Sequence, residues 1–440
     1  MKLLLVSPPF GEKGQMSQGL PIAPPVLEYL AGLTRRLRPD VEVTLHDANK
    51  VLFTPDMAAA YDLVGFTVLT PQAPWVYRTS DIIREAGGKV VAGGIHVTAL
   101  PEEAAVHVDS LVLGEAETVW DEVLRDFEQG SLKAHYCGEF APLEDLPRPV
   151  TGMLPRKGYV YGYFQTSRGC PHRCTFCSVH KFFGGKVRMR PIQDVVEEVA
   201  GSQWNLFWGI DDNIWGVNMD RTIELYGEMG RSVKRKWWFG SGDLATVQHP
   251  RADQLLANAR KAGLTAVLVG WESNNMMSLK EYKAVNKQGR ERRDAIRKIR
   301  SHGIEVMLFI MVGGRQDTRA DFEGILELCE ELKVSAHPVM TTPLPGTELY
   351  REYEPHLLPG MDWDCYDGNR ALFEHDSMTP AEREEALVRL RAELFTIPRI
   401  LGRIPQISWK GFPMSHITSW MVQYPQGRAF REYARQRGML

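Results

Sequence analysis

The feature that most constrains the fold is an alternation of short apolar runs with amphipathic segments, which occurs twice along the chain. In the first stretch, five runs have the pattern of buried strands: residues 3–7, 41–45, 63–69, 89–92 and 110–113. Strands that alternate with helices form a parallel sheet covered on both faces. The sequence therefore predicts an α/β fold with a doubly wound, Rossmann-like domain over residues 1–142. Ligands of such a domain bind at the carboxyl ends of the strands.

A proline-rich segment, 143–157, follows this stretch and is predicted to be a linker. After it, six apolar runs have strand patterns: 163–166, 206–209, 237–241, 266–270, 305–312 and 337–342. Six strand–helix units in succession predict an incomplete (β/α)6 barrel over residues 158–355. The remaining chain, 356–440, is predicted to be a helical extension, with a helical pattern from Thr379 to about Ile404.

Composition excludes several classes of protein. The formal net charge is −3 and no long basic run occurs, so nucleic acid is not a predicted partner. The N-terminal apolar run is interrupted by Pro8, too early for a signal peptide, and no stretch reaches the ~18 apolar residues of a membrane span. Six cysteines, three of them close together, do not form a secreted disulfide pattern. The cysteine content fits a protein of the reducing cytoplasm.

Cys170, Cys174 and Cys177 follow a predicted strand with the spacing C-x3-C-x2-C. Three thiolates on one tight loop can ligate three irons of a [4Fe–4S] cluster and leave the fourth iron open. The alternative is a zinc site, with His172 or His180 as the fourth ligand. Zinc motifs usually contain two cysteine pairs, and no second pair follows here. The spacing therefore favours the cluster.

The segment Cys170–Cys177, with an aromatic residue before its last cysteine, resembles the signature of the radical S-adenosylmethionine (SAM) superfamily. Residues 90–120 resemble the end of the cobalamin-binding-like domain that precedes the barrel in one subgroup, which includes the anaerobic magnesium-protoporphyrin cyclase. Five further segments resemble successive barrel signatures of that subgroup: 210–213, 270–273, 286–287, 309–314 and 342–347. The resemblance implies a [4Fe–4S] cluster, SAM, and an electron donor such as flavodoxin, ferredoxin or a dedicated reductase.

The resemblance also assigns residues to a SAM site. Phe176 would pack near the adenine, Asp211 would lie near the SAM amine, and Glu272 would contact the ribose or the amine. Gly313 and Gly314 would let the backbone approach the adenine closely, because glycine has no side chain.

Arg188 could engage the SAM carboxylate or an anionic substrate, or could belong to an exposed basic stretch. The other candidates also have purely structural alternatives. Asp211 or Asp212 could cap a helix, and the glycine pair could form a turn. Glu272 could be a surface charge at a strand end. The sequence leaves these alternatives open.

Cobalamin binding is left uncertain by the sequence. The D-x-H-x-x-G motif of many cobalamin domains is absent, and only fifteen residues separate Asp47 from Leu63. The loop Thr70–Trp75 is bulky and stiff where a nucleotide tail would need room. These features favour an N-terminal domain that covers the barrel mouth without a corrinoid.

On this basis the sequence favours a radical SAM dehydratase. A 5′-deoxyadenosyl radical would take hydrogen from a polar natural product, such as an aminoglycoside diol in antibiotic biosynthesis, and the substrate radical would lose water. Four residues are candidate acids or bases near strand ends or the cysteine loop: Tyr163, His180, Asp243 and His337. A cobalamin-dependent C-methyltransferase is the alternative, and a redox-sensing iron–sulfur protein is a second alternative.

Overall fold

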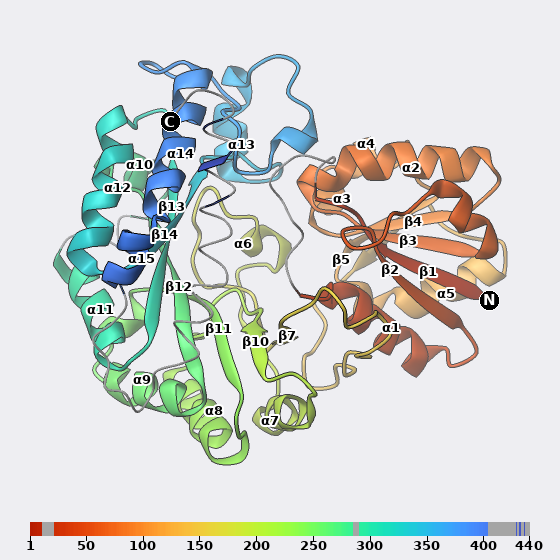
Figure 1. Cartoon of the computed structure of the whole chain (residues 1–440). Helices are drawn as coiled ribbons and strands as arrows, with labels where there is room; N and C mark the ends of the chain where they lie inside the picture. The colour runs from red at the N-terminus through yellow and green to blue at the C-terminus, as the bar shows by residue number, and fades with distance from the viewer. Residues whose placement is uncertain (11–21, 285–289, 404–427, 429–430, 433–434, 436–440) are drawn as a thin grey trace.

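The computed structural model contains two parallel α/β bodies that lie side by side (Figure 1). It describes residues 1–10, 22–284, 290–403, 428, 431, 432 and 435. The predicted fold class is confirmed, because each body is built on a six-stranded parallel sheet. The segment 143–157 joins the two bodies and contains no helix or strand. The limits of the individual domains remain predictions.

The N-terminal sheet has the strand order β2-β1-β3-β4-β5-β6. Its strands are β1 (Lys2–Ser7), β2 (Glu42–Asp47), β3 (Leu63–Thr67), β4 (Val90–Gly93), β5 (Ser110–Gly114) and β6 (His135–Gly138). Its helices are α1 (Pro25–Leu37), α2 (Ala73–Glu85), α3 (Ile95–Ala99), α4 (Pro101–Ala104) and α5 (Trp120–Glu128). Three short 3-10 turns complete it: η1 (Pro55–Ala60), η2 (Thr70–Gln72) and η3 (Ala116–Thr118).

The order of this sheet reverses at β1, which pairs with β2 on one side and with β3 on the other. This is the topological switch point at which open α/β sheets bind ligands. One face of the sheet packs against α1 and α5 and buries Leu5, Val91 and Val112. The opposite face packs against α2 and buries Val64 and Ala92. Successive side chains of a strand point to opposite faces, so each face carries its own apolar set. Helices cover both sets.

The second sheet has the order β14-β13-β12-β11-β10-β7 and curves into an incomplete barrel (Figure 1). Its strands are β7 (Gly162–Phe164), β10 (Leu206–Gly209), β11 (Trp237–Gly242), β12 (Leu264–Glu272), β13 (Glu305–Val312) and β14 (Ser335–Met340). The helices that alternate with them are α7 (Ile192–Gly201), α8 (Met219–Ser232), α9 (Ala252–Lys261), α10 (Met276–Glu281), α11 (Arg290–Ser301) and α12 (Arg319–Leu332). A short antiparallel hairpin, β8 (Ser167–Arg168) with β9 (Arg188–Met189), brackets the cysteine segment and the helix α6 (Val179–Phe182).

The barrel strands bury alternate residues. Along β13, Val306, Leu308 and Ile310 pack in the core beneath the helices, whereas the intervening residues are half-buried. Because side chains alternate across a strand, the half-buried set faces the barrel interior. Phe309 belongs to this set and meets His337 of β14 with 5.2 Å between ring centroids.

The C-terminal part comprises α13 (Glu348–Tyr353), two 3-10 turns, η6 (Glu354–His356) and η7 (Trp363–Cys365), and the helices α14 (Pro380–Leu394) and α15 (Ile397–Arg403). Thr379 caps α14 through a capping box with Glu382, which explains where the predicted helical pattern begins. Trp363 reaches the N-terminal domain, where its indole donates a 2.9 Å hydrogen bond to Glu103.

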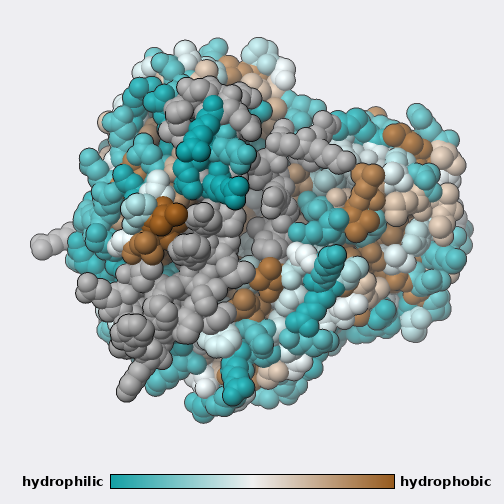
Figure 2. Space-filling view, in the orientation of Figure 1, coloured by the Kyte–Doolittle hydropathy of each residue, from teal (hydrophilic) through white to brown (hydrophobic). Residues whose placement is uncertain are grey.

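The surface that Figure 2 shows is mainly hydrophilic, with hydrophobic residues in small separate groups. Among the helices of the described residues, none is long and apolar enough to cross a membrane.

Candidate active site

The cysteine segment lies between β8 and α6 and is held by backbone contacts on both sides. The amide of Gly169 donates to Asp212 at 2.8 Å. The hydroxyl of Thr175 donates to the carbonyl of Glu281 at 2.9 Å, and the carbonyl of Thr175 accepts from Leu349 at 3.0 Å. The loop is therefore tied to the ends of β10, α10 and α13, which gives it a defined position at the barrel mouth.

Burial and nearby acidic groups raise the pKa of two of the thiols in this loop. Burial, together with nearby Cys174 and Asp212, raises the pKa of Cys170 to about 11, and burial raises that of Cys177 to about 12. Such thiols need a cation to become thiolates, which an iron–sulfur cluster supplies. In the part of the chain that the structure describes, no group of three or more His, Cys, Asp or Glu side chains is already arranged around one metal position. The cluster assignment therefore rests on the donor chemistry and spacing of the cysteines and on the comparisons below.

Asp211 is fully buried after β10, and its carboxylate is occupied by the chain that leads into the cysteine loop. It accepts hydrogen bonds from the amide and hydroxyl of Thr166 at 3.0 and 2.9 Å and from the amide and hydroxyl of Ser167. This arrangement makes Asp211 a brace for the loop. The neighbouring Asp212 is less saturated, and burial raises its pKa to about 6. Of the two carboxylates, Asp212 is the better placed to meet a ligand at the cysteine loop.

Glu272 ends β12 in a left-handed backbone conformation, with φ of 65°, where the register with β13 shifts. A non-glycine residue in this region costs energy, and such residues concentrate at functional sites. Glu272 is buried next to Trp271, whose ring lies 3.5 Å from the guanidinium of Arg292. Glu272 is therefore not the exposed strand-end charge of the alternative interpretation. Its assignment to the SAM site remains a prediction.

We predict that Glu272→Ala weakens SAM binding. A hydrogen bond from a charged group contributes about 1.5–3 kcal/mol, so the dissociation constant for SAM should rise roughly 10- to 150-fold. Equilibrium titration of the cluster-loaded protein with SAM measures this. Lys333→Ala is the matched control, because Lys333 also has a left-handed backbone (φ 55°) but is exposed after α12. An unchanged SAM affinity in Glu272→Ala would assign this residue a purely structural role.

Phe176 and Gly314 both lie next to Tyr282, and Gly313 packs beside Met340. The ring of Phe176 lies edge-on to that of Tyr282, with 5.7 Å between centroids. A Cβ atom on Gly314 would come within 2.4 Å of the Tyr282 hydroxyl, and one on Gly313 would come within 2.5 Å of the Met340 sulfur. Gly313 also has a left-handed φ of 72°. Both glycines are therefore required by packing, whether or not the backbone also contacts adenine.

Arg188 and Tyr163 both point to the N-terminal domain. Arg188 makes a two-pronged ion pair with Glu115, at the end of β5, and donates to the carbonyl of Ala141 at 2.6 Å. Tyr163, on β7, donates its hydroxyl to the buried Glu28 of α1 at 2.8 Å. Arg188 is therefore not the exposed basic charge of the alternative interpretation, and its contact with SAM or an anionic substrate remains a prediction. Tyr163 was predicted to be an acid or a base, and its hydroxyl is hydrogen-bonded to Glu28 in the structure.

The other three acid–base candidates lie on separate elements. Asp243 follows β11, where it accepts from Asn213 and from the amide of Thr246, both at 2.6 Å, and lies 3.8 Å from His172 of the cysteine loop. Burial alone would raise the pKa of Asp243, but these contacts hold it below the usual range. His337 faces the barrel interior, and burial lowers its pKa to about 4. His180 lies on α6, and burial lowers its pKa as well.

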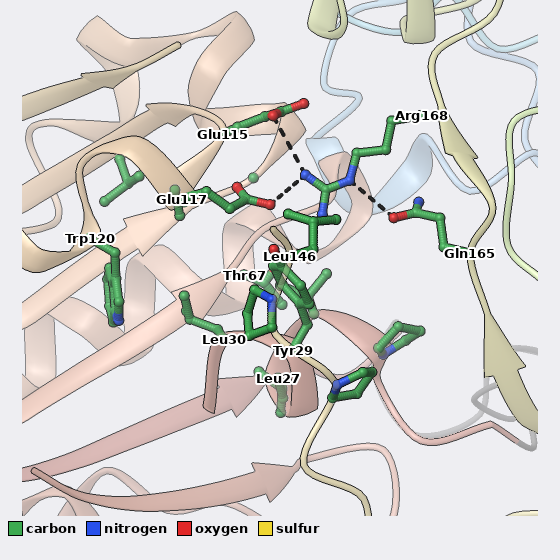
Figure 3. Close-up of a pocket in the computed structure, with 18 of the residues that line it drawn as sticks. Leu27, Tyr29, Leu30, Thr67, Glu115, Glu117, Trp120, Leu146, Gln165 and Arg168 are labelled. Atoms are coloured by element: carbon green, nitrogen blue, oxygen red, sulfur yellow. Dashed lines mark hydrogen bonds and ion pairs between the residues drawn. The ribbon is translucent and has the colours of Figure 1, made fainter. Parts of the chain in front are cut away.

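A cavity of about 290 Å³ lies between the two bodies, at the carboxyl ends of the N-terminal strands (Figure 3). Its floor is apolar and is formed by side chains of β1, β4, β5, α1 and α5: Leu5, Leu27, Leu30, Val91, Val112 and Trp120. Three glycines of the strands also line it: Gly65, Gly93 and Gly114. A cavity at a topological switch point is where this class of fold binds its ligand.

The opposite side of the cavity is polar and is formed by residues of both bodies, among them Glu115 and Glu117 after β5 and Arg168 of β8. Figure 3 shows Arg168 reaching towards Glu115, Glu117 and Gln165 above the apolar floor. Arg168 makes an ion pair with Glu117, lies 3.5 Å from Glu115, and donates to Gln165 at 3.0 Å. Its guanidinium lies 5.3 Å from the ring centroid of Tyr29. The wall of the cavity is therefore two residues from the first cysteine.

The two segments that were expected to hinder a corrinoid, the loop 70–75 and the span after Asp47, lie away from the cavity. The residues of the bulky loop 70–75 do not line this cavity. They form η2 and the start of α2, where Trp75 packs edge-on against Phe53 and Phe66 on the opposite face of the sheet. The span after Asp47 contains only the short turn η1, as predicted, and it also lies away from the cavity. Neither feature restricts the cavity.

Comparison with known proteins agrees with this geometry. The radical SAM superfamily matches residues 164–329, and the B12 binding domain matches residues 19–124. The chain is 26% identical, over 98% of its length and 94% of the other protein's, to bacteriochlorophyllide d C-12(1)-methyltransferase of Chlorobaculum tepidum. It is 27% identical to the anaerobic magnesium-protoporphyrin IX monomethyl ester cyclase of Rubrivivax gelatinosus, over 73% of this chain and 63% of the cyclase.

The fold also matches a solved structure over nearly the whole chain. The radical SAM methyltransferase TsrM of Kitasatospora setae, solved with cobalamin and a [4Fe–4S] cluster, has a TM-score of 0.68 and 18% identity, covering 98% of this chain and 99% of TsrM. The B12 binding match spans β2 to β5 of the first body, and the radical SAM match spans β8 to β13 of the second body and includes the cysteine loop. The chain therefore contains a region that matches the radical SAM superfamily, preceded by a region that matches the B12 binding domain.

Proposed function

We propose that this chain is a cobalamin-dependent radical SAM methyltransferase that methylates a carbon atom of a small molecule. The observation that carries the proposal is the cavity between the two bodies, which opens beside the cysteine loop. One side of it belongs to the domain that matches B12 binding, and the other side includes Arg168, which lies two residues before the first cysteine. Relatives of both kinds, in sequence and in fold, are named as methyltransferases.

The proposed cluster site lies in the second body, and the proposed corrinoid site is formed mainly by the N-terminal body. When bound, the cluster and SAM supply a 5′-deoxyadenosyl radical and cobalamin supplies the methyl group. Cys170, Cys174 and Cys177 would hold the cluster, and the hydrogen bonds of Asp211 to Thr166 and Ser167 keep their loop in place. The apolar floor of the cavity would keep water away from a bound corrinoid. An electron donor such as flavodoxin or ferredoxin completes the system.

The barrel interior is the proposed substrate site. Its half-buried side chains include Trp208 and Phe239, stacked with 5.6 Å between centroids, and the pair Phe309 and His337. These aromatic faces favour a planar or apolar portion of the substrate. His337 is neutral at neutral pH because burial lowers its pKa to about 4, so it can accept a hydrogen bond from the substrate. Asp243 would remain ionised near the cysteine loop.

Dehydration without a corrinoid is the weaker candidate. It was favoured by a supposed lack of space in the N-terminal domain, and the cavity removes that reason. Two of its acid–base candidates, Tyr163 and Asp243, already have hydrogen-bond partners within the protein.

The two functions predict different products from SAM. A methyltransferase of this type must consume SAM in two ways and release both S-adenosylhomocysteine and 5′-deoxyadenosine. We expect the anaerobically reduced protein, loaded with cobalamin, to form about one S-adenosylhomocysteine per corrinoid even before substrate is added. The same preparation without corrinoid is the control and should form none. Chromatography of the quenched mixture quantifies both products.

Two results would contradict the proposal. One is 5′-deoxyadenosine formation that is equal with and without corrinoid, with no S-adenosylhomocysteine. The other is the absence of a deuterium-labelled methyl group from the product when deuteromethyl SAM is used. The first result would support the dehydratase.

A further inference from the structure

We propose that Arg383 and His375, both in the C-terminal part of the chain, are positioning residues for the adenosyl half of SAM. They hold the two carbonyl groups of the turn Gly313–Gly314, and it is this turn that contacts SAM. The inference rests on the proposed function, because it requires that SAM binds at the cysteine loop. It goes beyond that function by giving the segment after the barrel a part in the SAM site.

The turn Gly313–Gly314 follows β13 and lies one side chain away from the cysteine loop. A Cβ atom on Gly314 would come within 2.4 Å of the hydroxyl of Tyr282. The ring of Tyr282 is in edge-on contact with Phe176, which stands between the second and third cysteines of the loop. We therefore expect the adenosyl group of SAM, bound at the open iron, to reach this turn.

Two consecutive glycines do not hold the shape of a turn by themselves. Glycine adopts left-handed and right-handed conformations with similar ease, and Gly313 has a φ of 72°. The peptide groups of the turn can therefore reorient at little cost unless other residues hold them. Asp317, three residues further on, accepts from the amide of Gly314 at 3.1 Å and donates its own amide to the carbonyl of Gly314 at 2.9 Å. The further contacts come from the C-terminal part.

His375 binds the carbonyl of Gly314 from a position 61 residues later in the chain. Its Nδ1 accepts hydrogen bonds from the amides of Ser377 and Met378, both at 3.1 Å, so this nitrogen carries no proton. The hydrogen of the neutral ring is then on Nε2, which donates to the carbonyl of Gly314 at 3.1 Å. The tautomer of His375 is thus the one that holds the turn.

Arg383 of α14 binds the other carbonyl of the turn, that of Gly313, at 3.2 Å. The residue is 0% exposed, and its second contact is again a carbonyl, that of Phe373. Burial lowers the pKa of Arg383 to about 10, so its guanidinium is charged at neutral pH.

A buried charge is costly, and its contacts with carbonyls offset only part of that cost. An apolar side chain would fill the same space without burying a charge. The contact with the turn therefore explains why an arginine stands at position 383.

Binding of SAM and of methionine to the full-length, cluster-loaded protein tests this inference. Methionine has the amine and the carboxylate of SAM but lacks the adenosyl group. We expect Arg383→Met and His375→Phe each to weaken SAM binding on the order of 10-fold, the effect of one lost hydrogen bond, and to leave methionine binding unchanged. Anaerobic equilibrium dialysis against each labelled ligand, with the cluster oxidised so that SAM is not cleaved, measures both affinities.

Arg391→Met is the matched control. Arg391 lies on the same helix and is also buried, but it donates to the carbonyl of Pro338 at 3.0 Å and not to the turn. Both affinities should be unchanged in this variant. His375→Gln is the conservative variant, because its amide can donate to the same carbonyl, and it should restore most of the SAM affinity that His375→Phe loses.

The outcomes separate this inference from the proposed function. Unchanged SAM affinity in His375→Phe, or in a folded Arg383→Met, would overturn the inference, and so would equal losses for SAM and methionine. In both cases the formation of S-adenosylhomocysteine with corrinoid would stand. Failure of the wild-type, cluster-loaded protein to bind SAM would contradict the proposed function itself. The pair His375→Phe and His375→Gln decides the inference even if Arg383→Met does not fold, because His375 is only half-buried.

Discussion

Cys174→Ala is expected to abolish SAM cleavage. Cys174 is the most buried of the three cysteines in the loop. A cluster with one open iron needs three thiolates, so two remaining cysteines cannot hold it in the same state. After anaerobic reconstitution, we expect about four irons and four sulfides per wild-type chain and a small fraction of that in the variant. Iron and sulfide assays, together with 5′-deoxyadenosine formation under reducing conditions, measure the effect.

Cys329→Ala is the matched control for this prediction. Cys329 is also buried, but it lies in the helical layer of the barrel on α12, away from the loop. Cluster content and SAM cleavage should therefore be unchanged in this variant. Full cluster content in Cys174→Ala would contradict the assignment. Stoichiometric zinc in the wild-type protein, without charge-transfer absorbance, would instead support a zinc site.

Glu115→Gln is expected to destabilise the protein by about 3–5 kcal/mol, the usual consequence of breaking a buried ion pair. The side chain of Glu115 is only 2% exposed. It forms ion pairs with Arg188 and Arg168 and accepts a hydrogen bond from the amide of Ala141. Removing its charge leaves both arginines, each less than a fifth exposed, without their shared partner. Because these arginines belong to the hairpin that brackets the cysteine loop, the variant should also retain less cluster.

The urea midpoint of unfolding, followed by tryptophan fluorescence, measures this loss. Glu197→Gln is the control, since Glu197 forms a 2.8 Å ion pair with Arg148 in which both side chains are about half exposed. Such a pair contributes about 0–1 kcal/mol. Combining Glu115→Gln with Arg188→Met should recover part of the stability, because one of the unpaired charges is then gone. Equal midpoints for Glu115→Gln and Glu197→Gln would show that Glu115 is not a structural clamp.

The secondary structure was largely predictable because the strand signals are local. Apolar runs of four to eight residues between helical patterns located β10 and β13 with the bounds that the structure has. The strand β6 was missed, since HYCG has little apolar content. The hairpin of β8 and β9 was also missed as a pair. Its strands are two residues long and are joined across the cysteine segment, so no periodic pattern marks them.

The site was less predictable because its central contacts are between residues far apart in the chain. Glu115 and Arg188 meet across 73 residues, and Arg168 and Glu117 across 51. A single sequence carries no signal for such pairs. The two glutamates that follow β5 in the segment GEAE were a usable hint, because acidic residues at the carboxyl end of a parallel strand lie where ligands bind. The cavity lies on the face of the N-terminal sheet that α1 and α5 cover, and the sequence does not show which face these helices cover.

Two parts of the sequence analysis fall outside the described residues. The pair Asn286 and Lys287, part of the barrel resemblance, lies in the range 285–289, and most of the chain after Arg403 is also not described. The roles of Phe176, Asp211, Glu272, Gly313, Gly314 and Arg188 in SAM binding remain predictions, as does acid–base catalysis by Tyr163, His180, Asp243 and His337.

The central claim is that one chain holds a cluster and a corrinoid on the two sides of the same interface. Metal analysis of the full-length protein, purified anaerobically from cells supplied with cobalamin, tests it most directly. We expect about one cobalt and four irons per chain, with corrinoid absorbance beside that of the cluster. The expected cobalt follows from the cavity of the N-terminal domain, and the irons follow from Cys170, Cys174 and Cys177. A protein that contains its iron and sulfide but no cobalt, under conditions where corrinoid is abundant, would contradict the account.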